Sequence, residues 1–212
     1  MVTGSESAEA VKGMRKWREN IRKEIRGMHI KKNLTEQDFI EMEALEKRYY
    51  SEEYIADYHD AHDWYTDLPF TTVAAEDQGK IIGFLELFPV SDKVFALLKE
   101  GAFNDKYLEK SEIIDVSRPV GSPVNLFFSC IVIDEAYRKT DTLKMMLKYY
   151  AAFYSSLAAD GLDIENVIID NVTEDGERFS GRMGFERLTE SDHGTVVYMQ
   201  DFNHFTEVIE KL

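Results

Sequence analysis

The fold of this chain is organised around NLFFSCIVIDEAYRKTDTLKMMLKYY, residues Asn125 to Tyr150. The stretch begins with an almost unbroken apolar run from Leu126 to Ile133, which predicts a buried central strand. After a short polar turn, apolar residues recur at helical spacing and predict a helix. Such a turn points the first N–H groups of the helix past the end of a buried strand. An anion such as a diphosphate can bind there.

The start of this predicted helix carries an excess of positive charge. Residues 137–149 hold four cationic side chains against one acidic side chain, in a chain whose net charge is −15. The cationic residues are Arg138, Lys139, Lys144 and Lys148. Cations beside a helix N-terminus attract an anion through hydrogen bonds and through positive potential. The local reversal of charge therefore supports an anion site.

The bulk composition predicts one soluble domain. A chain of 212 residues is long enough for a single filled core. No apolar run approaches the roughly 18 residues that a membrane span needs, so no membrane crossing is expected. Cys130 is the only cysteine, which rules out an internal disulfide, and no short apolar signal-peptide core follows the N-terminus. These features favour a reducing, cytoplasmic location.

The charge is distributed unevenly along the chain. Residues 1–28 contain seven Lys or Arg against four Glu, a net of +3, so the remaining residues carry −18 within the total of −15. Phosphate neutralisation dominates nucleic-acid affinity, and an acidic body therefore argues against non-specific binding to nucleic acid. The acidity suits a cationic partner, although it can equally serve solubility alone.

A basic amphipathic helix is predicted over residues 8–26. Four large apolar side chains recur there at spacings of three and four, and Lys and Arg surround them. Such a helix can lie on a membrane or bind an acidic partner. We favour an accessory segment, residues 1–28, that docks on the acidic body or on a second copy of the chain in a homodimer. Residues 29–212 then form a single domain.

Two helices are expected before the first hairpin. Thr35 followed by Asp38 resembles an N-cap arrangement that opens a helix to about Tyr49, and Ser51 caps a second helix over about 52–65. The second helix mixes aromatic side chains with carboxylates. Its surface can hold a cationic amine by charge and cation–π contact, or can be half-buried with a solvated acidic face. These side chains are Tyr54, Tyr58, Trp64 and Tyr65 and Asp57, Asp60 and Asp63.

His59 and His62 lie one turn apart on the same predicted helix. A pair at this spacing can belong to a metal site, but a zinc site needs at least a third protein ligand. No third ligand with matching spacing is evident in the sequence. We therefore predict no metal.

Strand patterns begin with a short segment at 29–32 and continue in a hairpin over 70–75 and 80–88. Glu86 is the only ionisable residue in the apolar run IIGFLELF of this hairpin. Its carboxylate can point outward to water, or inward as a base with a raised pKa. Residues 91–123 lack a clear strand pattern and predict an insertion, which can be a lid beside a site or a peripheral flap.

The remaining chain alternates helices and strands. A long helix over about 143–158 ends at Gly161, a buried strand follows at 166–170, and a short helix covers about 174–183. Two final strands are joined around His193 and Gly194, and a short helix ends the chain. Strand, helix and strand at this length imply a right-handed parallel crossover. The fold class is α/β with a mixed sheet.

Two motifs resemble the GNAT superfamily of acyl-CoA-dependent N-acyltransferases. IVIDEAYRKTDTLKMML resembles the family's strand, turn and helix, and ERFSGRMGFERL resembles its late helix that ends in Gly-Phe. The resemblance covers roughly residues 29–202. It implies a mixed, mostly antiparallel sheet with a central, splayed parallel strand pair and flanking helices. It also implies transfer of an acetyl group from acetyl-CoA, as co-substrate, directly to a primary amine of a small molecule or peptide.

The resemblance also implies a coenzyme site. Backbone groups of Ile131 and Ile133 would meet the pantetheine arm, and Arg138 matches the family's Arg or Gln. Backbone N–H groups from Lys139 to Leu143 would face the diphosphate, and a strand N–H near Ile131 or Val132 would hold the oxyanion. The full set is Ile131, Val132, Ile133, Arg138, Lys139, Thr140, Asp141, Thr142, Leu143 and Asn171.

The sequence departs from the family's pattern at three positions. Asp141 and Leu143 stand where the family usually has glycine. The Asp141 carboxylate can cap the helix and occupy its N–H groups, or can point at Lys144 or solvent. Ser180 stands where the family has a tyrosine that protonates the departing thiolate, and Ser180 is therefore a candidate acid, although a serine is a poorer one. Water or Tyr137 could take this role instead, and Ser180 can equally be a small helix residue with no catalytic role.

The chemistry implied by the resemblance needs a base for the amine, and Glu86 is the candidate. Cys130 is a weaker candidate for a nucleophile, because a thiol buried in a strand usually has a raised pKa. The alternative is a non-catalytic, GNAT-like binding or regulatory module whose coenzyme site is degenerate.

Overall fold

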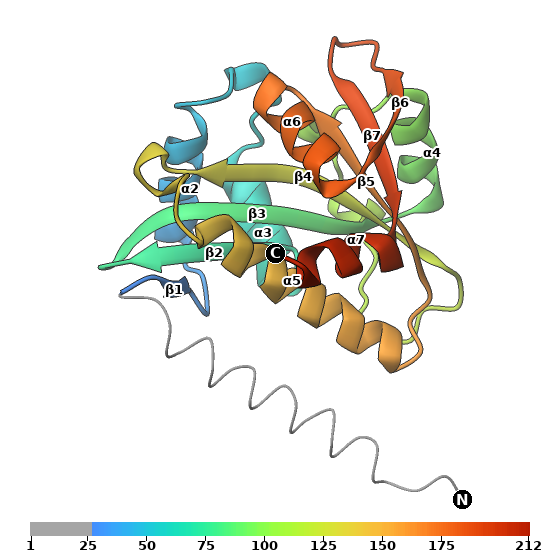
Figure 1. The fold of residues 1–212 in the computed structure, drawn as a ribbon, viewed down its shortest axis with the longest axis horizontal. Helices are drawn as coiled ribbons and strands as arrows, with labels where there is room; N and C mark the ends of the chain where they lie inside the picture. The colour runs from blue at the N-terminus through green and yellow to red at the C-terminus, as the bar shows by residue number, and fades with distance from the viewer. Residues whose placement is uncertain (1–26) are drawn as a thin grey trace, which may run out of the picture.

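The computed structural model describes residues 27–212, so the helix predicted over 8–26 lies outside the described residues. In the described part of the chain, seven strands form one sheet in the order β1-β2-β3-β4-β5-β7-β6 (Figure 1). Among the strands of residues 27–212, only β4 and β5 pair in parallel, which confirms the predicted mixed, mostly antiparallel sheet. The strands are β1 His29–Ile30, β2 Thr72–Asp77, β3 Lys80–Val90, β4 Val124–Ile133, β5 Ile164–Asn171, β6 Glu186–Glu190 and β7 Val196–Asp201.

Helices cover both faces of the sheet. Helices α5 and α7 pack on one face together with α6, whereas α2, α3 and α4 lie on the other (Figure 1). The α-helices are α2 Glu36–Glu46, α3 Tyr58–Asp67, α4 Asp92–Glu100, α5 Thr142–Ala159, α6 Glu174–Met183 and α7 Phe202–Glu210. Short 3₁₀ turns are η1 Glu52–Tyr54, η2 Asp105–Tyr107, η3 Lys110–Glu112 and η4 Glu135–Tyr137.

The central strand β4 is buried on both faces, as its continuous apolar run predicts. Leu126 and Phe128 enter the core under α5 and α7, while Phe127 enters the core on the side of α4. Tyr150 and Tyr154 on α5 are fully buried, and their hydroxyls donate to backbone carbonyls of the β2 and β3 region. Burial of these phenols is compatible with the core because each hydroxyl has a partner.

Strands β4 and β5 separate part of the way along their length. Their parallel pairing ends at Phe128 and Ile169, although β4 continues to Ile133. A β-bulge lies at this point, because Cys130 pairs with Glu86 and Phe128 with the next residue of β3, so Ser129 is left over. A bulge bends its strand and increases the twist, which moves β4 away from β5. The opening is the splayed pair that the resemblance implies.

The second predicted helix begins later than expected. Its predicted start near Ser51 forms only the turn η1, and α3 starts at Tyr58 with Asp57 as N-cap, whose Oδ1 accepts from the His59 N–H at 2.8 Å. Ile55 is buried between η1 and α3 and has an extended backbone conformation, which interrupts the predicted helix. Asp57, a favourable N-cap residue, then starts the helix at Tyr58. Helix α2 ends at Glu46, before the predicted Tyr49.

The segment over 91–123 packs on the sheet through α4 and η3. Val94, Leu98 and Ile113 are buried in one cluster with side chains of β3 and β4. The 3₁₀ turn η2 places Asp105 next to Ser129 on β4, at 2.7 Å between Asp105 Oδ2 and the Ser129 hydroxyl. This segment therefore contributes to the region around the bulge.

Two kinds of feature are absent from the described residues. Across residues 27–212, no helix combines the length and the apolar character needed to cross a membrane. In the same part of the chain, no cluster of three or more His, Cys, Asp or Glu side chains has a geometry that could hold a metal ion.

Candidate functional site

A cleft of about 410 Å³ occupies the opening between β4 and β5. Ile131 and Ile133 direct their backbone groups into it, since the carbonyl of Ile131 accepts from the Tyr50 hydroxyl and that of Ile133 from Arg138 Nε, each at 3.3 Å. Backbone groups of successive strand residues alternate in direction, so Val132 faces β3 instead. Of the two predicted oxyanion donors, only the N–H of Ile131 therefore faces the cleft.

The N-terminus of α5 lies beside this cleft, which Leu143 lines. The N–H of Thr142 donates a hydrogen bond to the Thr140 hydroxyl at 3.3 Å. The N–H groups of Leu143 and Lys144 have no hydrogen-bond partner within residues 27–212. Asp141 occupies the N-cap position, and its side chain makes no capping hydrogen bond. The exposed Asp141 carboxylate thus leaves these donors open.

Arg138 is positioned at the mouth of the cleft by three contacts. Its guanidinium lies over the Tyr49 ring at 4.3 Å, its Nε donates to Ile133, and its Nη1 is 3.9 Å from the Asp175 carboxylate. A planar guanidinium held by stacking is pre-organised for an anion. Lys139 and Thr140 are exposed in the turn that leads to α5.

Ser180 lies behind the cleft rather than in it. Its side chain is fully buried, and Asn171 Nδ2 donates to the Ser180 hydroxyl at 2.9 Å. The same amide also donates to the carbonyl of Val196 at 3.4 Å. This pair joins α6 to β5 and β7, so the Ser180 hydroxyl is not placed to protonate a thiolate. Tyr137 is also turned away, since its hydroxyl donates to Asp77 at 2.8 Å.

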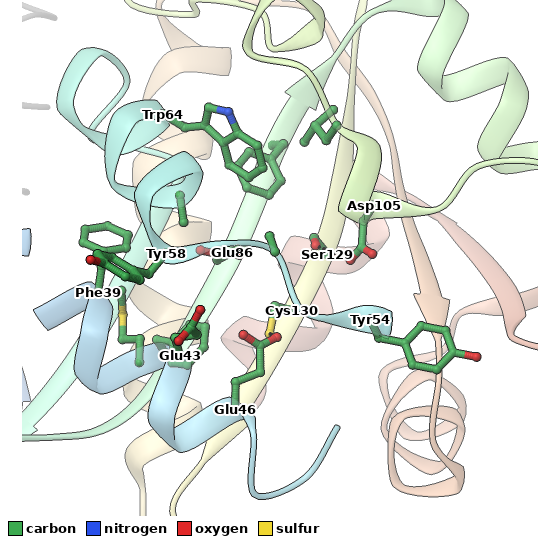
Figure 2. Close-up of a pocket in the computed structure, with 16 residues that line it drawn as sticks. Phe39, Glu43, Glu46, Tyr54, Tyr58, Trp64, Glu86, Asp105, Ser129 and Cys130 are labelled. Atoms are coloured by element: carbon green, nitrogen blue, oxygen red, sulfur yellow. Dashed lines mark hydrogen bonds between the residues drawn. The ribbon is translucent and has the colours of Figure 1, made fainter. Parts of the chain in front are cut away.

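A second, small cavity of about 30 Å³ adjoins the cleft and is lined by carboxylates (Figure 2). Ser129, the bulge residue, lines both spaces and marks where they meet. The four carboxylates come from three separate elements: Glu43 and Glu46 from α2, Glu86 from β3 and Asp105 from η2. Aromatic rings of Phe39, Tyr54, Tyr58, Trp64, Phe84 and Phe88 complete the wall.

Three of these carboxylates have raised pKa values. Burial, and then the charge of Glu86, raises the pKa of Glu46 to about 8. Burial, and then the charge of Asp105, raises the pKa of Glu86 to about 7. Burial also raises the pKa of Asp105 to about 6. Glu86 thus points inward, with 9 % of its surface exposed. Such groups exchange protons near neutral pH, as a catalytic base must.

The single cysteine belongs to the wall of the acidic cavity. The Cys130 thiol donates to Glu46 Oε1 at 3.3 Å, and burial raises the pKa of this thiol well above its usual range. Because the thiolate is the reactive form, Cys130 is not suited to nucleophilic catalysis. Figure 2 shows Glu46 pointing toward Cys130, and Asp105 toward Ser129.

The sequence identified only part of this cavity. Tyr54, Tyr58 and Trp64 line it as the amine interpretation requires, but Asp57, with 61 % of its side chain exposed, caps α3. Asp63 also lies outside the cavity and binds Lys110 at 2.8 Å. The carboxylates that do line the cavity, apart from Glu86, were missed. The sequence also does not indicate Tyr50, which lines the cleft. Their sequence neighbourhoods resemble ordinary exposed helix ends and loops.

Comparisons with known proteins place the fold. The sequence matches no protein-family model and no curated protein. Among solved structures, the loading GNATL domain of CurA from Lyngbya majuscula has a TM-score of 0.60 at 15 % identity, over 84 % of this chain and 98 % of that one. The GphF GNAT-like decarboxylase in complex with isobutyryl-CoA has a TM-score of 0.56 at 16 % identity, over 82 % and 98 % of the two chains.

An agmatine N-acetyltransferase has a TM-score of 0.52 at 12 % identity, over 83 % of this chain and 100 % of that one. The chain therefore has the fold of the GNAT superfamily. At these identities the likeness describes the fold, and the chemistry must be argued from the site.

Proposed function

We propose that this protein is an acyl-CoA-dependent N-acyltransferase that moves an acetyl group from acetyl-CoA to a primary amine of a cationic small molecule or peptide. One observation carries the proposal: two spaces meet at the bulge residue Ser129. The cleft offers backbone N–H groups that are open to an anion, and the cavity holds three carboxylates whose pKa values lie near 7. Direct transfer between two bound substrates needs two such spaces that meet at one point.

The coenzyme would bind in the cleft between β4 and β5. Its diphosphate fits the open N–H groups of Leu143 and Lys144, with the positive end of the α5 dipole and Arg138 nearby. The pantetheine arm would pair with the cleft-facing backbone of Ile131 and Ile133 and displace the Tyr50 hydroxyl from the Ile131 carbonyl. Support also comes from the isobutyryl-CoA bound to the GphF protein of the same fold.

The amine would bind in the acidic cavity. A cation there restores charge balance to Glu46, Glu86 and Asp105 and lies among aromatic faces, which attract it further. A volume of about 30 Å³ holds about two water molecules, so the segment between η1 and α3, which supplies Ala56 to the wall, has to move to admit a substrate. Agmatine, the substrate of one structural neighbour by its name, is a cationic amine.

The transfer follows from these positions. Glu86 takes a proton from the ammonium group, and the neutral amine attacks the thioester carbonyl. The N–H of Ile131 donates to the developing oxyanion. The carbon–sulfur bond then breaks, Tyr50 supplies a proton to the thiolate, and the second proton lost by the attacking nitrogen restores the Tyr50 hydroxyl. Burial raises the pKa of Tyr50, so its hydroxyl is protonated before the transfer begins.

Calorimetry and a transfer assay test the proposal together. Titration of the protein with acetyl-CoA should show saturable binding, and mass spectrometry should detect acetylation in a panel of agmatine, putrescine and spermidine. Absence of any binding at millimolar coenzyme would refute the assignment. Binding without transfer to any amine would instead favour the GNAT-like binding module, which the buried Ser180 in place of the family's tyrosine also suggests.

Substitution of Asp141 should tighten coenzyme binding. The Asp141→Asn variant removes a negative charge beside the diphosphate site without removing a capping bond, since the carboxylate makes none. We expect a roughly three- to tenfold lower dissociation constant for acetyl-CoA, in the range of single charge effects at helix N-termini. Asp160→Asn at the other end of α5 is the matched control. Equal or weaker binding by Asp141→Asn would show that this charge does not face the ligand.

A further inference from the structure

Asp170 and His193 form a paired group at the rim of the cleft that the steps above do not use. Asp170 is the first residue of β5 beyond the last parallel pair with β4, and it lines the cleft. His193 lies in the turn between β6 and β7, and its Nε2 is 3.2 Å from Asp170 Oδ2. The other ring nitrogen, Nδ1, is 2.8 Å from Asp192 Oδ1.

The three side chains run from the interior to the surface. Asp170 has 11 % of its side chain exposed, His193 has 20 % and Asp192 has 73 %. Asp170 Oδ1 is buried and has no hydrogen-bond partner within residues 27–212. A buried acceptor without a partner is unfavourable and indicates a group that receives a hydrogen or a water at this position.

Acyl transfer produces a proton that has to leave the site. An ammonium group loses two protons when it becomes an amide, and the coenzyme thiolate takes only one of them. Glu86, the proposed base, sits in a small cavity and must return its proton before the next cycle. The other charged groups near His193 are Asp170, Asp192 and, through its charge, Asp105.

We propose that Asp170 and His193 carry this proton from the cleft to solvent. Asp170 accepts the proton from the acidic cavity through Asp105 or water, and passes it to Nε2 of neutral His193. The resulting imidazolium loses one proton to water, so the ring returns to its neutral form and the balance is one proton in and one out. The Thr195 hydroxyl, 3.2 Å from Nε2, and the bond of the Tyr54 hydroxyl to the His193 carbonyl, at 3.3 Å, hold the turn in place.

The pKa values of the pair are compatible with this role. Burial alone would lower the pKa of His193, but the hydrogen bond to Asp192 and the charge of Asp170 raise it above its ordinary value. Burial raises the pKa of Asp170. A raised pKa makes the Asp170 carboxylate a better proton acceptor, as the first step of the relay needs.

The proposal rests on the proposed acyltransferase activity and is tested with acetyl-CoA and the amine of the panel that the wild type acetylates fastest. We expect His193→Ala and His193→Gln to lower kcat at least about tenfold, as loss of an acid–base group does. The KM for acetyl-CoA should stay unchanged. Added imidazole should restore the rate of His193→Ala in proportion to its concentration. Asp170→Asn should lose the same activity without rescue.

Exposed His204 provides the matched control, and His204→Ala should behave as the wild type. Retention of kcat within twofold by both His193 variants over pH 6–9 would overturn the relay. A loss that imidazole does not reverse, in a His193→Ala variant that melts as the wild type does, would also overturn it and assign the ring a structural role. Absence of transfer by the wild type would refute the proposed function itself, and is distinguishable from both results.

Discussion

Replacement of Glu86 by glutamine is expected to lower kcat for amine acetylation by about 10²- to 10⁴-fold, the usual contribution of a positioned base. The amide has the same shape but cannot take a proton from an ammonium group. The KM for acetyl-CoA should remain within about twofold of wild type, because Glu86 lines the acidic cavity and not the coenzyme cleft. Steady-state kinetics at several pH values with the fastest amine measures both parameters.

The matched control is Glu165→Gln, because Glu165 is an exposed carboxylate on β5. This variant should keep the kinetic constants of the wild type. If Glu86→Gln retained kcat within threefold, the base would have to be sought in Glu46 or Asp105. If the rate at a fixed amine concentration fell only because the amine bound more weakly, KM for the amine would rise while kcat stayed unchanged, and Glu86 would be a binding residue.

The second large effect concerns stability. The free energy of unfolding should fall by several kcal/mol as the pH rises from about 5 to about 9, since one pKa unit corresponds to about 1.4 kcal/mol. In the unfolded chain, Glu46, Glu86 and Asp105 have lost their protons throughout this pH range. In the folded chain their pKa values are about 8, 7 and 6, so each carboxyl keeps its proton until the pH passes that value. The folded state binds more protons, so rising pH favours unfolding.

Urea unfolding of Glu46→Gln tests this contribution. The amide oxygen can still accept from the Cys130 thiol, but the residue no longer titrates. The variant should therefore be more stable than wild type at pH 8.5 and should show a smaller loss of stability between pH 5 and 9. Glu165→Gln should follow the wild-type curve. A wild-type protein whose stability rose over this range would contradict the raised pKa values.

Much of the architecture follows from local patterns. The apolar run of β4, the helical period of α5 and the Gly-Phe ending of α6 lie within single segments, and their elements formed close to the predicted bounds. The start of α3 was missed because Ser51 and Asp57 both suit an N-cap. Only the anchoring of Ile55 in the core decides between them. Such a choice depends on tertiary packing.

The candidate site was only partly predictable. Glu86 stood out because a lone carboxylate interrupts an apolar strand. Glu46 and Asp105 lie in polar stretches, where an acidic side chain is the ordinary choice for a solvated surface, so neither carries a local signal. Ser180 matched a motif position, yet its partner Asn171 on another element turns it away from the cleft.

By itself, the sequence determined the order of elements, the buried central strand and the basic helix start, because hydrophobic periodicity and charge act over a few neighbouring residues. Tertiary structure alone decided that a bulge at Ser129 opens the sheet and that carboxylates from α2, β3 and η2 converge beside it. It also decided that their pKa values approach neutrality. Desolvation and mutual repulsion depend on which distant residues become neighbours, and that is a property of the folded chain.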